Sequence, residues 1–112
     1  MGTSEHLGEF EYVVMLALAR CGGEEYGAGV FEMIVEATGR RTSVPAVYVT
    51  LNRLEEKGYV RARRAAGATP RGGHRRKVFR LTSAGTAALH DTKRMFDGLW
   101  QGLNLGTADA PR

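Results

Sequence analysis

The chain has 112 residues, enough for one domain with a single hydrophobic core. Its 43% hydrophobic content is ordinary for a folded protein, and its longest apolar run, Tyr12 to Ala19, is too short to cross a bilayer. Nothing near the N-terminus resembles a secretory signal, so we expect a cytoplasmic protein without a membrane partner. One cysteine excludes an internal disulfide, and three scattered histidines lack metal-ligand spacing, so we expect neither metal nor cofactor.

The net charge of +4 hides a strong segregation along the chain. Residues 1–39 carry seven acids and one arginine, whereas residues 40–80 carry twelve Lys or Arg and two Glu. No acidic residue lies between Gly58 and His90. Because clustered Lys and Arg displace counterions from phosphates, the basic block predicts a polyanion-binding surface. The alternative is a solvated charged face.

The first two predicted elements are helices. Residues 7–20 place apolar side chains at helical spacing, and further apolar residues fill the opposite side, which predicts nearly complete burial and a partner surface. The stretch "CGGEEYG" interrupts the pattern with glycines. A second helix is predicted over residues 27–37, with Gly39 at its C-cap.

The third predicted helix carries the most information. Ser43 is a suitable N-cap, Pro45 falls in the first turn, and Gly58 closes the far end. One face is an apolar stripe of Val44, Val47, Leu51 and Leu54. The opposite face consists of Pro45, Ala46, Val49, Arg53 and Glu56, flanked by Tyr48, Thr50 and Asn52, and its first two turns contain no acid.

Two strands and a last helix follow. Alternating apolar and basic residues predict strands over 59–65 and 77–81, joined by a long loop rich in Gly, Pro and Arg. Thr82 can cap a helix over residues 83–103, with apolar residues at near-heptad spacing. This order predicts an α+β, mainly helical winged helix-turn-helix, in which the third helix enters the major groove of double-stranded DNA and the hairpin follows the backbone.

Several stretches resemble the PadR family of bacterial transcriptional regulators: "LGEFEYVVMLAL", "YG" at 26–27, "SVPAVYVTLNRLEEKGYV" and "RGGHRRKVFRLTSAG". The resemblance includes Tyr48, Leu51 and Leu54, and an element at Leu81, Thr82 and Gly85, and it extends from about Leu7 to Leu103. It implies a homodimer that binds an inverted-repeat operator, usually as a repressor, with the first and last helices at the interface. The single short last helix resembles the branch without a larger C-terminal domain, in which interface aromatics can line a pocket for flat hydrophobic effectors.

The organisation expected from these observations is a DNA-binding winged helix-turn-helix over residues 1–82, a dimerisation helix packed on it over 83–103, and a disordered tail over 104–112. The recognition-helix candidates are Ser43, Pro45, Ala46, Tyr48, Val49, Thr50, Asn52 and Arg53. The wing candidates are Arg71, Gly72, Gly73, His74, Arg75, Arg76 and Lys77. The candidates for the dimer interface or effector pocket are Phe10, Val14, Leu89, Phe96, Leu99, Trp100 and Leu103.

Three departures from the resembled pattern concern individual contacts. His74 stands where many relatives carry Arg, Val78 where an aromatic is frequent, and Pro45 and Ala46 where small residues including Gly are usual. The wing contact at residue 74 could therefore be weaker or depend on pH. The operator sequence cannot be transferred from relatives.

Most candidate residues have a simpler structural interpretation. Arg53 could pair with Glu56, Val49 could be buried against the wing, and Tyr48 could be a half-buried core residue. His74 could be a solvated loop residue and Trp100 simple dimer packing, and Cys21 could be incidental or a redox sensor.

At the level of function, the alternatives to a sequence-specific regulator are a protein-binding winged helix and a non-specific architectural DNA binder. Large apolar or acidic residues on the outer face of the third helix would favour protein binding, and none precedes Glu55. No convincing carboxylate pair, no Cys/His arrangement and no phosphate-binding glycine motif suggests an enzyme.

Overall fold

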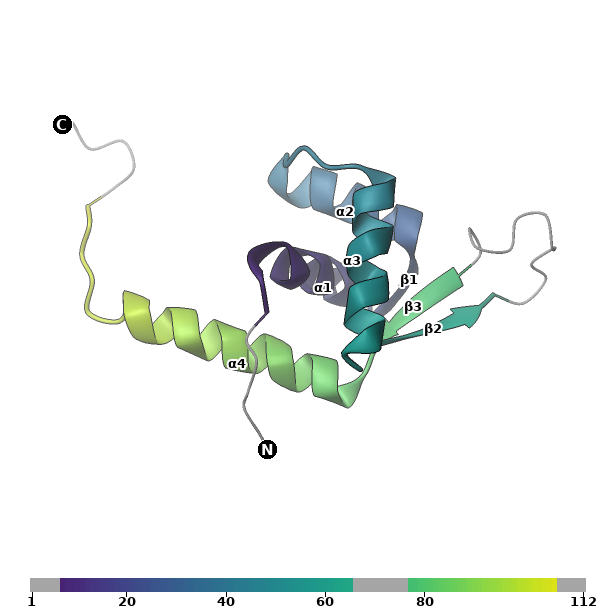
Figure 1. The fold of residues 1–112 in the computed structure, drawn as a ribbon. Coiled ribbons are helices and arrows are strands. Elements are labelled where there is room, and N and C mark those ends of the chain that lie inside the picture. The colour runs from purple at the N-terminus through teal and green to yellow at the C-terminus, as the bar shows by residue number, and fades with distance from the viewer. Residues whose placement is uncertain (1–6, 66–76, 107–112) are drawn as a thin grey trace.

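Four helices and a three-stranded antiparallel sheet form a winged helix in the computed structural model, which describes residues 7–65 and 77–106 (Figure 1). The mainly helical α+β fold expected from the sequence is confirmed. In chain order the elements are α1 (Glu9–Arg20), β1 (Glu24–Tyr26), α2 (Gly27–Thr38), α3 (Val44–Glu56), β2 (Val60–Arg64), β3 (Lys77–Leu81) and α4 (Ser83–Trp100).

Local signals at the ends of the helices explain most boundaries. The backbone N–H of Gly8 donates a hydrogen bond to Glu11 Oε1 at 2.8 Å and so caps α1. Helix α1 therefore begins at Glu9, two residues later than the predicted start at residue 7. Helix α2 ends where Gly39 adopts φ 68°, a left-handed conformation that glycine accepts at little cost. Ser43 caps α3 as predicted, because its Oγ accepts a hydrogen bond from the Ala46 N–H at 3.2 Å.

The sheet contains one strand that sequence reasoning missed. Its order is β1-β3-β2, so the predicted hairpin of β2 and β3 is extended by β1 on the other side of β3. Residues Glu24, Glu25 and Tyr26 pair with Arg80, Phe79 and Val78. The sequence predicts only a glycine-rich turn here. A three-residue strand leaves no clear pattern in the sequence, because its stability comes from pairing with β3.

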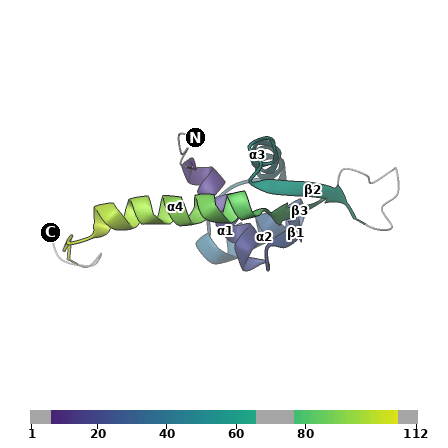
Figure 2. The same ribbon diagram turned by 90° about the horizontal axis from the view of Figure 1, so that it is seen from below.

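Helix α4 begins as predicted and ends earlier than predicted. Thr82 Oγ1 accepts a hydrogen bond from the Gly85 N–H at 3.0 Å and donates one to the Gly58 carbonyl at 2.7 Å, which fixes the start of α4 to the turn after α3. The helix ends at Trp100 and not at Leu103. Figures 1 and 2 show its second half extending beyond the other elements.

The core lies where the helices meet the inner face of the sheet. Its most deeply buried side chains come from α1, α2, α3, β2 and β3, each at most 1% exposed: Val14, Met15, Leu18, Val30, Ile34, Val47, Leu51, Leu54, Val60 and Phe79. Three of the four residues predicted as the inner stripe of the third helix are therefore fully buried. This packing fixes which side of α3 remains outside.

Candidate nucleic-acid interface

Helix α3 presents a polar and small-residue face to the outside. Pro45, Asn52 and Arg53 are exposed, Val49 is 56% exposed, and Ala46 is partly exposed. No acidic residue precedes Glu55 in this helix. Within residues 7–65 and 77–106 nothing covers Val49, so its methyl groups are accessible from the outer face of α3.

Two recognition-helix candidates face inward. Thr50 is 5% exposed, which leaves little of its side chain for a contact with DNA. Tyr48 is half-buried: its ring packs edge-on against Phe79 with centroids 5.9 Å apart. The ring also fills the space beside Gly27, where an added Cβ would lie 2.5 Å from it. This packing matches the interpretation of Tyr48 as a half-buried core residue. The Tyr48 hydroxyl is the only polar group of this side chain.

The far end of α3 is held by charged side chains of α1. Lys57 Nζ lies 2.9 Å from Glu11 Oε2, and the Glu11 side chain is only 9% exposed. Burial by itself raises the pKa of Glu11, but the hydrogen bonds from Lys57 and Gly8 and the nearby charge of Arg53 outweigh it, so the pKa lies below its usual value. A charged Glu11 thus fixes the last turn of α3 to the first turn of α1.

The connection between α2 and α3 is held by a second, exposed contact. The guanidinium of Arg40, in the turn before α3, pairs with Glu9 at 2.5 Å and lies 4.8 Å from the centroid of the Phe10 ring. The pairing lowers the pKa of Glu9 and raises that of Arg40, mainly through their mutual hydrogen bond. The first turn of α1 therefore contacts Arg40 in the connection before α3 and Lys57 directly after α3.

Arg53 forms no ion pair among the residues that the structure describes. Its expected structural alternative, a pair with Glu56, is not formed. The exposed guanidinium is therefore available to a partner on the same face as Val49.

At the base of the wing, the ends of β2 and β3 carry basic side chains. Arg64 and Lys77 are cross-strand partners at the outer ends of β2 and β3, and the Lys77 ammonium lies 5.5 Å from the centroid of the Phe79 ring. The other wing candidates lie outside the described residues: Arg71, Gly72, Gly73, His74, Arg75 and Arg76.

Sequence reasoning did not single out the basic side chains on the strands themselves. Arg61, Arg63, Arg64 and Arg80 are exposed, and Arg63 pairs with Glu24 at 2.7 Å. The signal was present in "YVRARRA", where alternation places every second residue on the same face of a strand. The four arginines belong to the basic block of residues 40–80, which predicts a polyanion-binding surface without assigning them individual roles.

The candidates for the dimer interface divide into buried and exposed residues. Val14, a candidate for the dimer interface or effector pocket, is fully buried in the chain's own core. Phe10 and Leu89 are half-buried, and Phe96 stacks on Tyr12 with ring centroids 6.1 Å apart while remaining 44% exposed. The exposed apolar residues follow at the far end of α4 and just beyond it: Leu99 at 69%, Trp100 at 60% and Leu103 at 54%.

Metal ligands, a membrane-spanning helix or a reactive cysteine would indicate other functions for the described residues. Over residues 7–65 and 77–106 no group of His, Cys, Asp or Glu is arranged to hold a metal ion. No helix in these two ranges has the length and apolar character needed to span a membrane. Burial and then the charge of Glu25 raise the pKa of the Cys21 thiol, which disfavours a reactive thiolate.

A winged helix whose exposed third helix has no acid in its first two turns, beside a basic hairpin, is typical of DNA-binding regulators. The chain belongs to the transcriptional regulator PadR-like family, because the sequence model of this family matches residues 15–91. It is thus a DNA-binding transcriptional regulator of a family that is not an enzyme family. A comparison with curated proteins finds no match.

Solved structures share the fold at low sequence identity. A winged-helix DNA-binding protein from STIV has a TM-score of 0.70 at 16% identity, over 89% of this chain and 100% of that chain. A PadR family regulator from hypervirulent Clostridium difficile has a TM-score of 0.66 at 22% identity, over 82% and 91%. Bordetella bronchiseptica BpsR, whose DNA binding is regulated by 6-hydroxynicotinic acid, has a TM-score of 0.63 at 18% identity, over 93% and 73%.

Proposed function

We propose that this chain is a homodimeric repressor that binds an inverted-repeat operator in the cytoplasm. The observation that carries the proposal is the outer face of α3, which exposes Pro45, Val49, Asn52 and Arg53 without an acidic neighbour in its first two turns. In a winged helix this face enters the major groove, where Arg reads guanine and apolar groups contact thymine methyls. Ser43 and Ala46 lie at the start of the same helix, where the proposed docking would bring them close to the DNA backbone.

Two copies are needed to read two half-sites. The far end of α4 extends from the body and, with the residues just beyond it, exposes the large apolar side chains Phe96, Leu99, Trp100 and Leu103, which together suit a protein interface. Pairing of two such ends buries this area and separates the two α3 helices by about one turn of DNA, roughly 34 Å. Residues 83–103 then act as the dimerisation segment on the domain formed by residues 1–82.

A small hydrophobic or aromatic effector binds at this interface and releases the operator. Trp100 and Phe96 supply flat apolar surfaces that suit an aromatic ring. Regulation of BpsR by 6-hydroxynicotinic acid supports the idea that this fold can be controlled by such a compound. A compound that changes the angle between the two copies would misalign their α3 helices with successive major grooves.

The decisive experiment is a fluorescence-anisotropy titration of the purified chain against its own upstream promoter duplex and a scrambled duplex, each at several salt concentrations. Selective, salt-sensitive binding with two chains per site is the expected result. Equal affinity for both duplexes would replace the operator-specific repressor with an architectural binder. Absence of salt-sensitive binding would point to a protein-binding winged helix.

The wing is tested in the same assay. Arg75→Ala together with Arg76→Ala removes two phosphate contacts, which should weaken all duplexes alike and flatten the salt slope by about two. Arg94→Gln is the control, because this arginine is exposed on α4 and pairs with Asp91. A loss confined to one operator would mean that the wing reads sequence and does not merely hold the backbone.

A further inference from the structure

The second half of α4 contacts the short segment from Leu7 to Tyr12, at the start of α1. The backbone N–H of Leu7 donates a hydrogen bond to Oγ1 of Thr92 at 3.4 Å, and Thr92 is fully buried. One turn further along α4, the Phe96 ring stacks on Tyr12 with 6.1 Å between the ring centroids and 19° between the ring planes. All described residues after Phe96 are exposed, so the stack lies where α4 leaves the body of the domain (Figure 1).

The same segment also holds the residues on either side of the recognition helix. Glu9 pairs with Arg40 in the connection before α3. Glu11 pairs with Lys57, directly after α3, through a carboxylate that is only 9% exposed. Because residues 9–12 form one turn of a hydrogen-bonded helix, a displacement of Tyr12 also displaces the two acids that hold Arg40 and Lys57.

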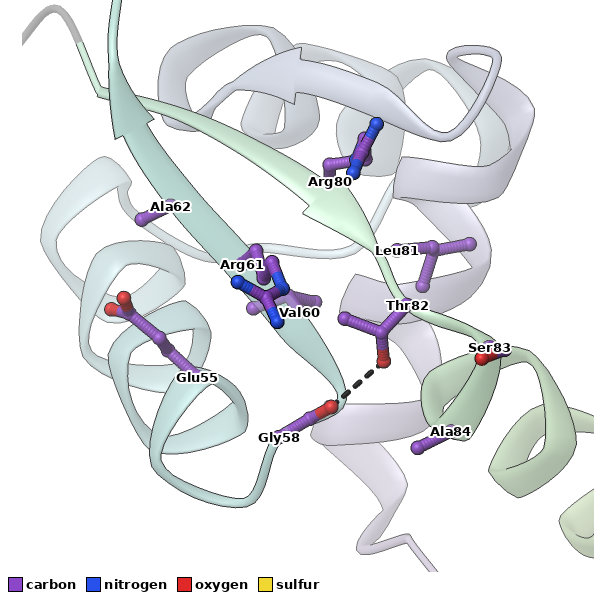
Figure 3. Close-up of a pocket in the computed structure, with 10 residues that line it drawn as sticks. All are labelled: Glu55, Gly58, Val60, Arg61, Ala62, Arg80, Leu81, Thr82, Ser83 and Ala84. Atoms are coloured by element: carbon purple, nitrogen blue, oxygen red, sulfur yellow. Dashed lines mark hydrogen bonds between the residues drawn. The ribbon is translucent and has the colours of Figure 1, made fainter.

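Helix α4 is fixed at its start and exposed at its end. Figure 3 shows the hydrogen bond from Thr82 Oγ1 to the Gly58 carbonyl, 2.7 Å long, which ties the start of α4 to the turn after α3. Gly85 packs so closely on the same turn that an added Cβ would lie 2.1 Å from the Tyr59 carbonyl oxygen. A partner bound at the exposed end can therefore tilt α4 about its start, and the tilt displaces Phe96 more than it displaces the first turn.

We propose that residues 9–12 of α1 couple the tilt of α4 to the position of α3, with Tyr12 and Phe96 as positioning residues for DNA binding. A second copy of the chain that binds the exposed end of α4 changes this tilt, and the turn transmits the change to Arg40 and Lys57 through packed side chains and ion pairs. The inference rests on the DNA binding and dimerisation proposed above and adds the route that connects them. If the stack only stabilised the fold, its loss would lower the stability without changing the ends of α3.

The first test is an NMR comparison of the full chain without DNA. Phe96→Leu removes the ring stack at a side chain that is 44% exposed, so the domain should still fold. The amide signals of Arg40 and Lys57 should shift in this variant. The shift should disappear in a background that carries Arg40→Gln and Lys57→Met, whereas a direct effect of the lost ring would persist there. Arg94→Gln is the control, because Arg94 is exposed on α4 and pairs with Asp91, and it should leave both signals in place.

The second test is a double-mutant cycle of operator affinity. Tyr12→Leu removes the stack from the side of α1 and keeps every side chain at the apolar end of α4. It should weaken operator binding about threefold or more in the original chain and should lose this effect in the background with Arg40→Gln and Lys57→Met. Independent roles would give the same loss in both backgrounds.

Two results would overturn the proposal. The first is unchanged Arg40 and Lys57 signals in Phe96→Leu, or shifts that persist in the background without the two ion pairs. The second is additive losses of operator affinity in the cycle. If the original chain does not bind its operator, the proposed function fails, but the NMR comparison still decides the coupling because it requires no DNA. The NMR comparison also remains decisive if Tyr12→Leu melts at a lower temperature, since it uses Phe96→Leu.

Discussion

Replacing Lys57 by Met tests whether the buried charge of Glu11 holds the recognition helix in place. Glu11 Oε2 accepts a hydrogen bond from Lys57 Nζ at 2.9 Å, and Glu11 Oε1 accepts one from the Gly8 N–H. Loss of Lys57 leaves a carboxylate that is 9% exposed with only the backbone donor. The substitution keeps the length and most of the apolar stem of the side chain, so the change isolates the charge.

The expected cost follows from the burial of the two partners. A hydrogen bond to a charged group contributes about 1.5–3 kcal/mol, and breaking a fully buried pair costs about 3–5 kcal/mol. The Lys57 side chain is 31% exposed, so water replaces part of the lost contact. We therefore expect Lys57→Met to lower the free energy of unfolding by about 1–2 kcal/mol at pH 7. Urea denaturation at fixed protein concentration measures this value.

The stability lost in Lys57→Met should become smaller as the pH falls. Because the folded state holds the pKa of Glu11 below its usual 4.5, the stabilisation is fully present above that value and is lost as the pH falls through the folded pKa. The difference between the original chain and the variant should therefore shrink on acidification. Lys93→Met is the control, because Lys93 forms an exposed pair with Asp97 on α4 and should have no resolvable effect. An equal cost for both variants, or a Lys57 cost independent of pH, would refute the reasoning.

Three other predictions concern α3 and α4. Arg53→Ala should weaken operator binding by about 1–3 kcal/mol and relax selectivity, measured by anisotropy, and unchanged selectivity would exclude base reading. Trp100→Glu should convert dimers to monomers in sedimentation without unfolding, since the side chain is 60% exposed; a persistent dimer would move the interface elsewhere. Gly85→Ala should lower the free energy of unfolding by about 1–3 kcal/mol, because the added Cβ would lie 2.1 Å from the Tyr59 carbonyl oxygen. Gly98→Ala should raise the free energy of unfolding by about 0.5–1 kcal/mol, because nothing lies within 4 Å of the added Cβ. Similar melting temperatures for the two glycine variants would contradict this account.

Elements with strong local signals were predictable from the sequence. The Ser43 cap, the proline in the first turn and the apolar stripe specify α3 within a few residues, and the Thr82 cap specifies the start of α4. Strand β1 was not predictable in this way, because Glu24, Glu25 and Tyr26 form a strand only when β3 supplies their hydrogen-bond partners.

Individual site residues were harder to place than the helix that carries them. A helical wheel locates Thr50 on the flank of α3 but does not reveal how far the neighbouring elements cover that flank. Val14 lies on a helix that is apolar on most sides, so the sequence does not distinguish its core face from a partner face. The Glu11 and Lys57 pair joins residues 46 positions apart, and no local pattern predicts such a contact.

The pairing of Arg64 with Lys77 has a consequence for how such a regulator can diversify. The two strand ends stay together through the ladder between β2 and β3, and β1 anchors β3 from the other side. The ends of the connecting segment are thus held by the sheet whatever its length, and each doubling of a loop costs only about 0.6 kcal/mol in closure entropy. Insertions and deletions between these two residues should therefore leave the folding of the domain unchanged, so the length of this segment can evolve separately from the core.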